Sequence, residues 1–178
     1  MSAGAGEQRF QFIDARDPMH EFPSALLAAL AKLLVPGGLL RLDVAVRDHA
    51  KIVRVAFELG ASQAQGSLQF ARRDIVQSSH EACQYLRRQE KFYDLSRCLE
   101  LISMAEWGGI GADDLLSVMP NVGLKLVGQI APTDLRVRYH MANPEDPKMA
   151  NLVNYETFMR QNLEECGDKF RLFLEKSE

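Results

Sequence analysis

The chain has 178 residues and a formal net charge of −3, with acidic and basic residues mixed throughout. This length suits one domain, the lack of a basic stripe argues against nucleic-acid binding, and no apolar run reaches the ~20 residues that a membrane-spanning helix needs. Three cysteines without CxxC spacing argue against a disulfide framework and a structural zinc site, and they favour a reducing, cytoplasmic location.

The first predicted elements alternate between strand and helix. The apolar segment from Phe10 to Ala15 predicts a short strand, and the Leu/Ala-rich segment from Ala25 to Leu34 predicts a helix with its leucines on one face. Ser24 precedes this helix, and its hydroxyl is suited to capping the first turn. Leu39 to Val46 then predicts a second strand. Because a helix separates the two strands, we expect them to be parallel.

A Pro-Gly-Gly sequence separates the first predicted helix from the second strand. Pro36 would end the helix, and Gly37 and Gly38 permit the positive φ of a turn back into the sheet. After the second strand, Asp48 is a candidate cap for a helix from His49 to Leu59.

The rest of the sequence is mainly helical until Gly123. The predicted helices cover residues 67–79, a short segment around residues 85–86, residues 95–104 with Asp94 as the cap, and residues 112–119. A strand at 124–130, helices at 134–140 and 151–163, and an apolar final strand at 170–174 follow. This order predicts an α/β or α+β layer fold, and α/β is the expected class. We expect residues 1–9 to be a disordered lead and residues 10–178 to form one domain, with a helical insert at 67–120.

Several segments resemble class I S-adenosylmethionine-dependent methyltransferases. Phe-Gln-Phe-Ile-Asp-Ala at 10–15 and Met-His-Glu-Phe-Pro-Ser at 19–24 resemble the family's fourth strand and the segment after it. Leu-Val-Pro-Gly-Gly-Leu-Leu at 34–40 resembles the approach to its fifth strand. The remainder resembles the C-terminal part of bacterial methyltransferases that are often fused to tetratricopeptide repeats, through residues 71–75, 92–98, 123–128, 138–147 and 158–173. The resemblance implies a partial Rossmann-like methyltransferase sheet.

The resemblance covers only the C-terminal half of the family's fold. In the family, a glycine-rich loop after the first strand cradles the cofactor, and an acidic residue after the second strand holds the ribose. Both would precede Phe10, and Gly4 and Gly6 have no strand before them. The resemblance therefore implies a sheet that lacks the N-terminal cofactor-binding strands, in a truncated protein that is inactive alone. S-adenosylmethionine is the implied cofactor, and the missing loop argues against its binding.

His20 and Asp14 are the candidate site residues. Ligands of open α/β sheets bind at the carboxyl ends of the strands, so both side chains would line the crevice. His20 would contact the cofactor or act as a catalytic base, and Asp14 would contact the cofactor. The structural alternative is that each residue only orders a turn. Relatives often have a second histidine where Glu21 stands, and the sequence has no pattern of metal ligands.

A group of charged residues follows the second predicted strand: Asp43, Arg47, Asp48 and His49. They could line a substrate pocket, but a solvated strand end followed by a helix cap is the favoured interpretation. Cys98 lies on the apolar face of its predicted helix and is expected to be a core residue.

An open sheet edge is the main physical consequence of a half-sheet. Unpaired strand edges invite pairing with another chain, so we expect a protein partner or a homodimer to cover this edge. The leading interpretation is a truncated methyltransferase-like protein. The alternative is a non-catalytic interaction module, a degenerate methyltransferase fold that acts through dimerisation or partner binding. A third possibility is an unrelated small α/β enzyme, and nothing in the sequence selects a methyl acceptor.

Overall fold

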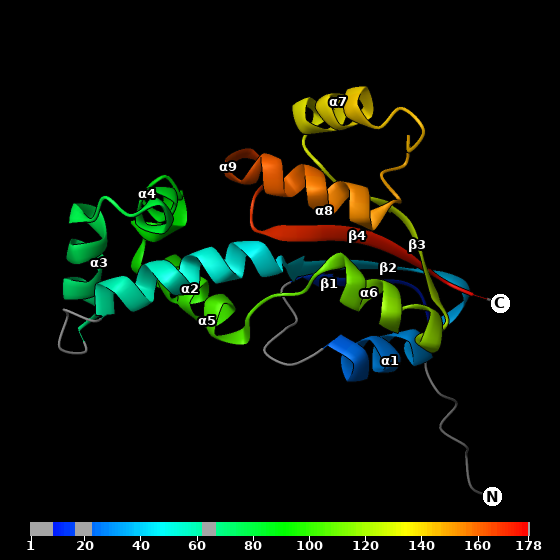
Figure 1. Cartoon of the computed structure of the whole chain (residues 1–178). Coiled ribbons are helices and arrows are strands. Elements are labelled where there is room, and N and C mark those ends of the chain that lie inside the picture. The colour runs from blue at the N-terminus through cyan, green and yellow to red at the C-terminus, as the bar shows by residue number, and fades with distance from the viewer. Residues whose placement is uncertain (1–8, 17–22, 62–66, 178) are drawn as a thin grey trace, which may run out of the picture. The chain divides into compact units, whose positions relative to one another are not determined.

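The structure is a computed structural model that describes residues 9–16, 23–61 and 67–177 (Figure 1). The chain divides into two compact units. The first, called the sheet unit, contains residues 1–44, 112–158 and 170–178, and the second, called the helical unit, contains residues 45–111 and 159–169. Residues 1–8 of the predicted lead lie outside the described residues. The single domain from 10 to 178 stays a prediction.

The named elements agree closely with the predicted order. The strands are β1 (Phe10–Arg16), β2 (Leu34–Ala45), β3 (Leu124–Gln129) and β4 (Lys169–Lys176). The helices that begin in the sheet unit are α1 (Pro23–Leu33), α6 (Ala112–Val118), η2 (Pro120–Val122), α7 (Thr133–Ala142) and α8 (Leu152–Gln161). Those of the helical unit are α2 (Arg47–Ala61), α3 (Leu68–Gln77), α4 (Glu81–Arg87), η1 (Glu90–Phe92), α5 (Leu95–Trp107) and α9 (Leu163–Cys166).

The sheet has the order β1-β2-β4-β3. β1 and β2 are parallel, as predicted from the helix between them, and β3 and β4 are antiparallel. Figure 1 shows α1 and α6 on one side of the sheet and α8 on the other. The structure therefore confirms the predicted α/β fold class.

Alternate residues of β2 have opposite environments. Leu40, Leu42 and Val44 are buried in the core. On the opposite face, Leu39 is exposed and Arg41 is half-buried. Because successive strand side chains point to opposite faces, one face of β2 carries the core and the other carries polar and exposed residues.

The Pro-Gly-Gly sequence lies inside β2 rather than before it. β1 and β2 change register here, because Phe10 pairs with Leu34 whereas Phe12 pairs with Leu39. Gly37 has the predicted positive φ, at +73°. A Cβ on Gly38 would lie 2.8 Å from the carbonyl oxygen of Val35, so this position requires glycine. The predicted turn is therefore a bulge within an earlier-starting strand.

Helix boundaries correct two predicted caps. α1 begins at Pro23, so Ser24 lies within the helix rather than before it. α2 begins at Arg47, so Asp48 lies in the first turn. The helix-capping prediction for α5 is confirmed, since the Asp94 carboxylate accepts a hydrogen bond of 2.9 Å from the backbone N–H of Arg97.

The helical unit packs around α2, which contacts α3, α4 and α5. Its buried core consists of Val53, Ala56, Ile75, Ala82, Cys83, Leu86, Phe92, Cys98, Leu101 and Ala105. The prediction that Cys98 is a core residue is confirmed. A Cβ on Gly60 would lie 2.7 Å from the carbonyl oxygen of Ala71, so this glycine lets α2 and α3 approach closely.

We predict that truncation of β2 side chains has opposite outcomes on the two faces. Leu42 is 0% exposed and Leu39 is 38% exposed. Leu42→Ala should lower the free energy of unfolding by about 2–5 kcal/mol because it leaves a cavity. Leu39→Ala should cost less than about 1 kcal/mol. Urea unfolding followed by circular dichroism measures both values, and equal losses would contradict the one-sided burial of β2.

Candidate functional site

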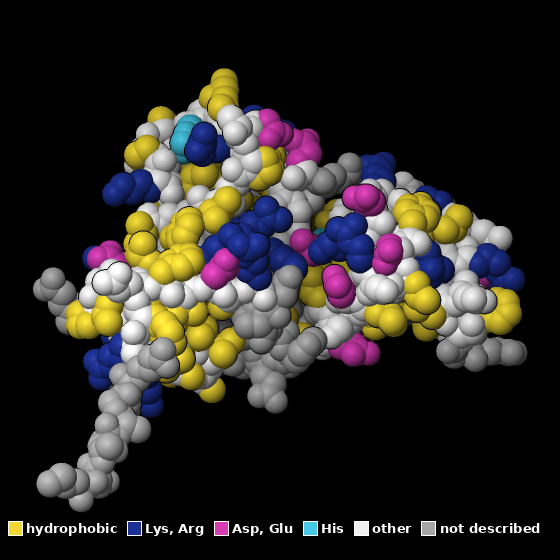
Figure 2. Space-filling model, turned by 180° about the vertical axis from the view of Figure 1, so that it is seen from behind, with side chains coloured by type: hydrophobic (Ala, Val, Ile, Leu, Met, Phe, Trp, Pro, Cys, Tyr) yellow, Lys and Arg dark blue, Asp and Glu magenta, His cyan; other side chains and the backbone are white. Residues whose placement is uncertain are grey.

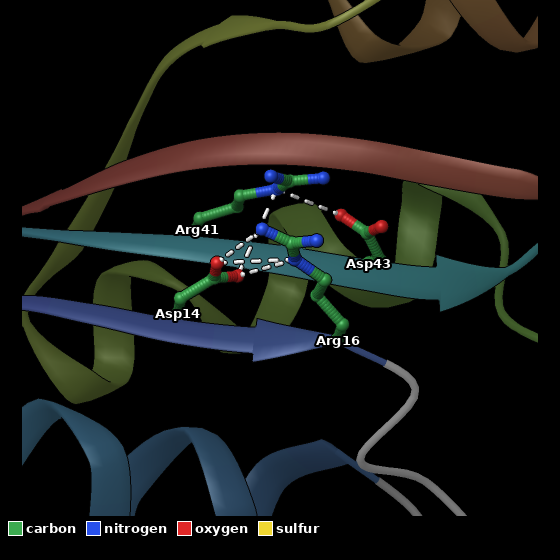
Figure 3. Close-up of polar contacts among 4 residues, drawn as sticks. All are labelled: Asp14, Arg16, Arg41 and Asp43. Carbon is green, nitrogen blue, oxygen red and sulfur yellow. Dashed lines mark hydrogen bonds and ion pairs between the residues drawn. The ribbon is translucent and has the colours of Figure 1, made fainter.

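Four charged side chains lie at the carboxyl ends of β1 and β2, and we call them the charged cluster (Figure 3). They are Asp14, Arg16, Arg41 and Asp43. The strand register pairs Asp14 with Arg41 and Arg16 with Asp43, so the sign of the charge alternates both along and across the strands. Because residues two apart share a face, all four side chains belong to one face of the sheet.

The charged cluster is held by short contacts. The guanidinium of Arg16 donates from Nε to both oxygens of Asp14, at 3.1 and 3.0 Å, and from Nη2 to Oδ2 at 2.7 Å. Nε of Arg41 lies 3.8 Å from Oδ1 of Asp14 and 3.4 Å from Oδ1 of Asp43. Side-chain exposure falls from 60% for Arg16 to 10% for Asp43, so the cluster runs from solvent toward the interior.

These contacts fix the protonation state of Asp14. The hydrogen bonds from Arg16, helped by the charges of Arg16 and Arg41, hold the pKa of Asp14 below its ordinary value. The same contacts raise the pKa of Arg16. A carboxylate that stays ionised and already accepts from an arginine is a weak base near neutral pH. Asp14 therefore suits an acceptor role toward hydroxyl or amino groups better than proton abstraction.

The structure places only one of the two predicted site residues. Asp14 lies near the carboxyl end of β1, and its side chain is 31% exposed. His20 and Glu21 belong to residues 17–22, which lie outside the described residues. The catalytic role of His20 and the cofactor contacts of Asp14 and His20 stay predictions.

The helical unit holds a second group of titratable residues. His49 is fully buried in the first turn of α2, and its Nδ1 lies 2.5 Å from the hydroxyl oxygen of Tyr85. Its Nε2 is buried and has no hydrogen-bond partner among the described residues. Nearby, Nζ of Lys91 donates to Oδ2 of Asp168 at 2.6 Å. The interpretation of His49 as part of a solvated strand end was wrong.

Burial decides the protonation of this second group. Loss of water around His49 lowers its pKa to about 4, against an opposing effect of the Asp168 charge. Burial raises the pKa of Asp168, but the charge and hydrogen bond of Lys91 outweigh this and leave it below the ordinary value. The signal in the sequence was spacing, because His49, Val53 and Ala56 lie at i, i+4 and i+7 on the buried face of α2.

A cavity of about 670 Å³ lies in the sheet unit, away from the charged cluster. We call it the cationic cavity, and it is lined by Arg9, Phe10, Ala29, Lys32, Leu33, Leu34, Pro36 and Lys176. It adjoins the amino ends of β1 and β2, whereas the charged cluster lies toward their carboxyl ends. Its volume is in the range of ligand pockets, and most of its lining is apolar.

Within the described part of the chain, no group of three or more His, Cys, Asp or Glu side chains is arranged to hold a metal ion. None of the described helices combines the length and the apolar character that a membrane crossing requires.

Two solved structures share the fold of this chain. One is PKMT2 from Rickettsia typhi, with a TM-score of 0.62 and 18% sequence identity, and the other is PKMT2 from Rickettsia typhi in complex with AdoHcy, with a TM-score of 0.55 and 16% identity. Each match covers 96% of this chain and 36% of the other protein. The chain therefore has a methyltransferase-like α/β fold and spans little more than a third of the length of these proteins.

Sequence comparison alone finds no relative. No family model matches the chain, and no curated protein matches it. At 16–18% identity, the structural matches establish the fold and leave the activity to be tested.

We predict that Arg16 controls the titration of Asp14. Arg16→Gln should raise the pKa of Asp14 toward its ordinary value, because the charged donor on both carboxylate oxygens is lost. Carbon-detected NMR titration of the Asp14 carboxyl measures this change. Arg73→Gln, which removes the exposed partner of Asp74, is the matched control and should leave Asp14 unchanged. An unshifted Asp14 in Arg16→Gln would refute the pairing.

We also predict a pH dependence from His49. Its pKa is lower in the folded chain than the ordinary 6.5, so the unfolded chain binds the proton first as pH falls. Neutral His49 therefore stabilises the folded chain, fully above about pH 6.5, and this stabilisation is lost as the pH falls toward 4. Its full size is about 3 kcal/mol of unfolding free energy. His49→Gln should unfold with a shallower pH dependence than the unchanged chain in urea melts at pH 7, 6 and 5. Parallel pH dependences would contradict a buried, neutral His49.

Proposed function

We propose that this chain is a methyltransferase-like protein of the class I S-adenosylmethionine-dependent type, and that the described residues supply one wall of the cofactor crevice. The observation that carries the proposal is the match of 96% of the chain to a protein whose complex with AdoHcy is known. AdoHcy is what remains of S-adenosylmethionine after its methyl group is transferred. The parallel pair β1 and β2, with Asp14 near its carboxyl end, agrees with the crevice position in open α/β sheets.

The described residues do not by themselves fit a complete cofactor site. The glycines with positive φ lie in the β2 bulge, at helix ends or before strands, at positions 37, 108, 109, 123 and 167. None of these described glycines forms a loop that leads from a strand into a helix in the way that cradles a cofactor. We therefore propose that the chain is inactive alone, and that Asp14 and His20 contact S-adenosylmethionine only when another polypeptide segment completes the crevice.

The second candidate function is a non-catalytic interaction module, in which a degenerate methyltransferase fold acts through dimerisation or partner binding. The observation that favours it is the position of β1, which has β2 as its one strand neighbour among the described residues. Phe10 and Phe12 of this edge strand are exposed. A protein partner or a second copy would cover them, whereas nucleic acid and membrane are not proposed as partners.

We propose a cytoplasmic location for either function. Cys83 and Cys98 are free thiols that are buried in the helical unit. Unpaired buried cysteines are usual in a reducing compartment.

Calorimetric titration with S-adenosylmethionine and with S-adenosylhomocysteine tests the leading proposal. We expect no saturable heat and no thermal shift up to about 1 mM of either ligand. A ligand bound with a Kd near 1 μM would stabilise the chain by about 4 kcal/mol at that concentration, so its binding would be visible in the melting temperature.

Saturable micromolar binding that Asp14→Ala abolishes and Asp74→Ala preserves would overturn the claim of inactivity alone. It would instead support a cofactor site complete in this chain. Light scattering on the same sample separates the second candidate, since a stable dimer without cofactor binding favours the interaction module.

A further inference from the structure

The outer edge of β1 has no strand neighbour among the described residues. In a parallel pair, alternate residues of each strand direct their backbone N–H and C=O groups away from the partner strand. β1 borders only β2 among the strands that the structure describes, so its outward groups lack a strand neighbour in that part of the chain. Phe10 is 39% exposed and Phe12 is 52% exposed. Edges of this kind are templates for an added strand.

The cationic cavity adjoins the start of this edge. Phe10 belongs both to β1 and to the lining of the cavity. The apolar part of the lining comes from Phe10, Ala29, Leu33, Leu34 and Pro36. Hydrophobic side chains also gather at the surface on the face shown in Figure 2, beside groups of basic and acidic side chains. A strand that adds to β1 could place an apolar side chain in this cavity.

The charges that line the cavity have one sign. Among the residues that the structure describes, the charged ones that line the cavity are Arg9, Lys32 and Lys176, and no described lining residue is a carboxylate. Nζ of Lys176 donates to the backbone carbonyl of Ala31 at 3.0 Å, which fixes this ammonium at the C-terminal end of α1. Three cations around an apolar cavity attract an anion that carries an apolar group.

We propose that the edge of β1 and the cationic cavity together bind an extended, acidic and apolar peptide segment of a partner protein. The segment adds as a strand to β1, places one apolar side chain in the cavity, and directs a carboxylate toward Lys32 or Lys176. In this mode of recognition, main-chain hydrogen bonds supply affinity and a pocket for alternate side chains supplies specificity. The proposal rests on the interaction function proposed above and needs neither cofactor binding nor methyl transfer.

Charge complementarity favours such a partner over a second copy. An antiparallel pair of β1 strands would bring the end of one strand beside the cavity of the other. The last residue of β1 is Arg16, and the nearby carboxylate of Asp14 is already held by Arg16. A second copy would therefore bring a neutral ion pair to the cavity, whereas an acidic segment would bring an unpaired charge of the opposite sign.

A phage-displayed library of random ten-residue peptides tests the proposal on the full chain. Enriched peptides should carry Asp or Glu together with apolar residues at alternate positions. Their synthetic forms, measured by fluorescence anisotropy, should lose at least about tenfold in affinity for Lys32→Glu and for Phe12→Lys. Both positions are exposed, so the variants should fold, and circular dichroism checks this.

Matched controls lie elsewhere on the sheet unit. Lys148→Glu reverses an exposed lysine outside the cavity, and Val137→Lys changes an exposed apolar residue of α7. Both should bind the peptides as the unchanged chain does. No enrichment, enrichment of basic peptides, or equal binding by Lys32→Glu would overturn the proposal. If the unchanged chain is a dimer and Phe12→Lys converts it to monomers, the segment that pairs with β1 belongs to a second copy and not to an acidic partner.

The result of the peptide-binding experiment can be interpreted independently of the cofactor titration. Peptide binding with no cofactor binding supports the interaction function and this inference together. Cofactor binding with no peptide binding overturns this inference and leaves the crevice proposal standing.

Discussion

The parallel pairing of β1 with β2, in the register that holds from Phe12 to Arg16, is the constraint on which the sheet unit depends. This register directs Leu40 and Leu42 into the core and brings Asp14 opposite Arg41 on the other face. A slip of one residue would bury charges and expose leucines, so hydrophobic burial and ion pairing favour the same alignment. The geometry of the charged cluster is therefore a consequence of core packing, because the strands that form the core also carry the charges.

The Pro-Gly-Gly bulge allows β1 and β2 to pair in this register although β2 contains extra residues. Between the pairs that Phe10 and Phe12 form, β2 contains three more residues than β1 needs. The positive φ of Gly37 and the missing Cβ of Gly38 let the backbone absorb them. The bulge contains Pro36 and follows Leu34, which both line the cationic cavity, so the same irregularity shapes the cavity and sets the alignment of Asp14 with Arg41.

Local patterns in the sequence predicted most helices and strands. They did not predict the contacts between residues that are distant in the sequence. Apolar spacing and Asp94 located α5, and the helix between two apolar segments predicted a parallel pair. The hydrogen bonds from Arg16 to Asp14 depend on side-chain rotamers and on the strand register, which no local sequence pattern encodes. The spacing of His49 with Val53 and Ala56 was that of a buried helix face, but its position after a strand suggested a helix cap. Tertiary packing against Tyr85 determined that His49 is buried. The methyltransferase-like fold was predicted from short segments and confirmed by structural comparison.

The sequence of β1 also bears on how the chain behaves at high concentration. The strand reads Phe-Gln-Phe-Ile-Asp-Ala-Arg, with Arg9 immediately before it and Arg16 at its end. Aromatic edge segments with low charge are prone to stacking into fibrils, and flanking cations act as gatekeepers that oppose this stacking by repulsion between copies. Because salt screens this repulsion, the solubility of the isolated chain should depend on ionic strength more than its modest net charge suggests.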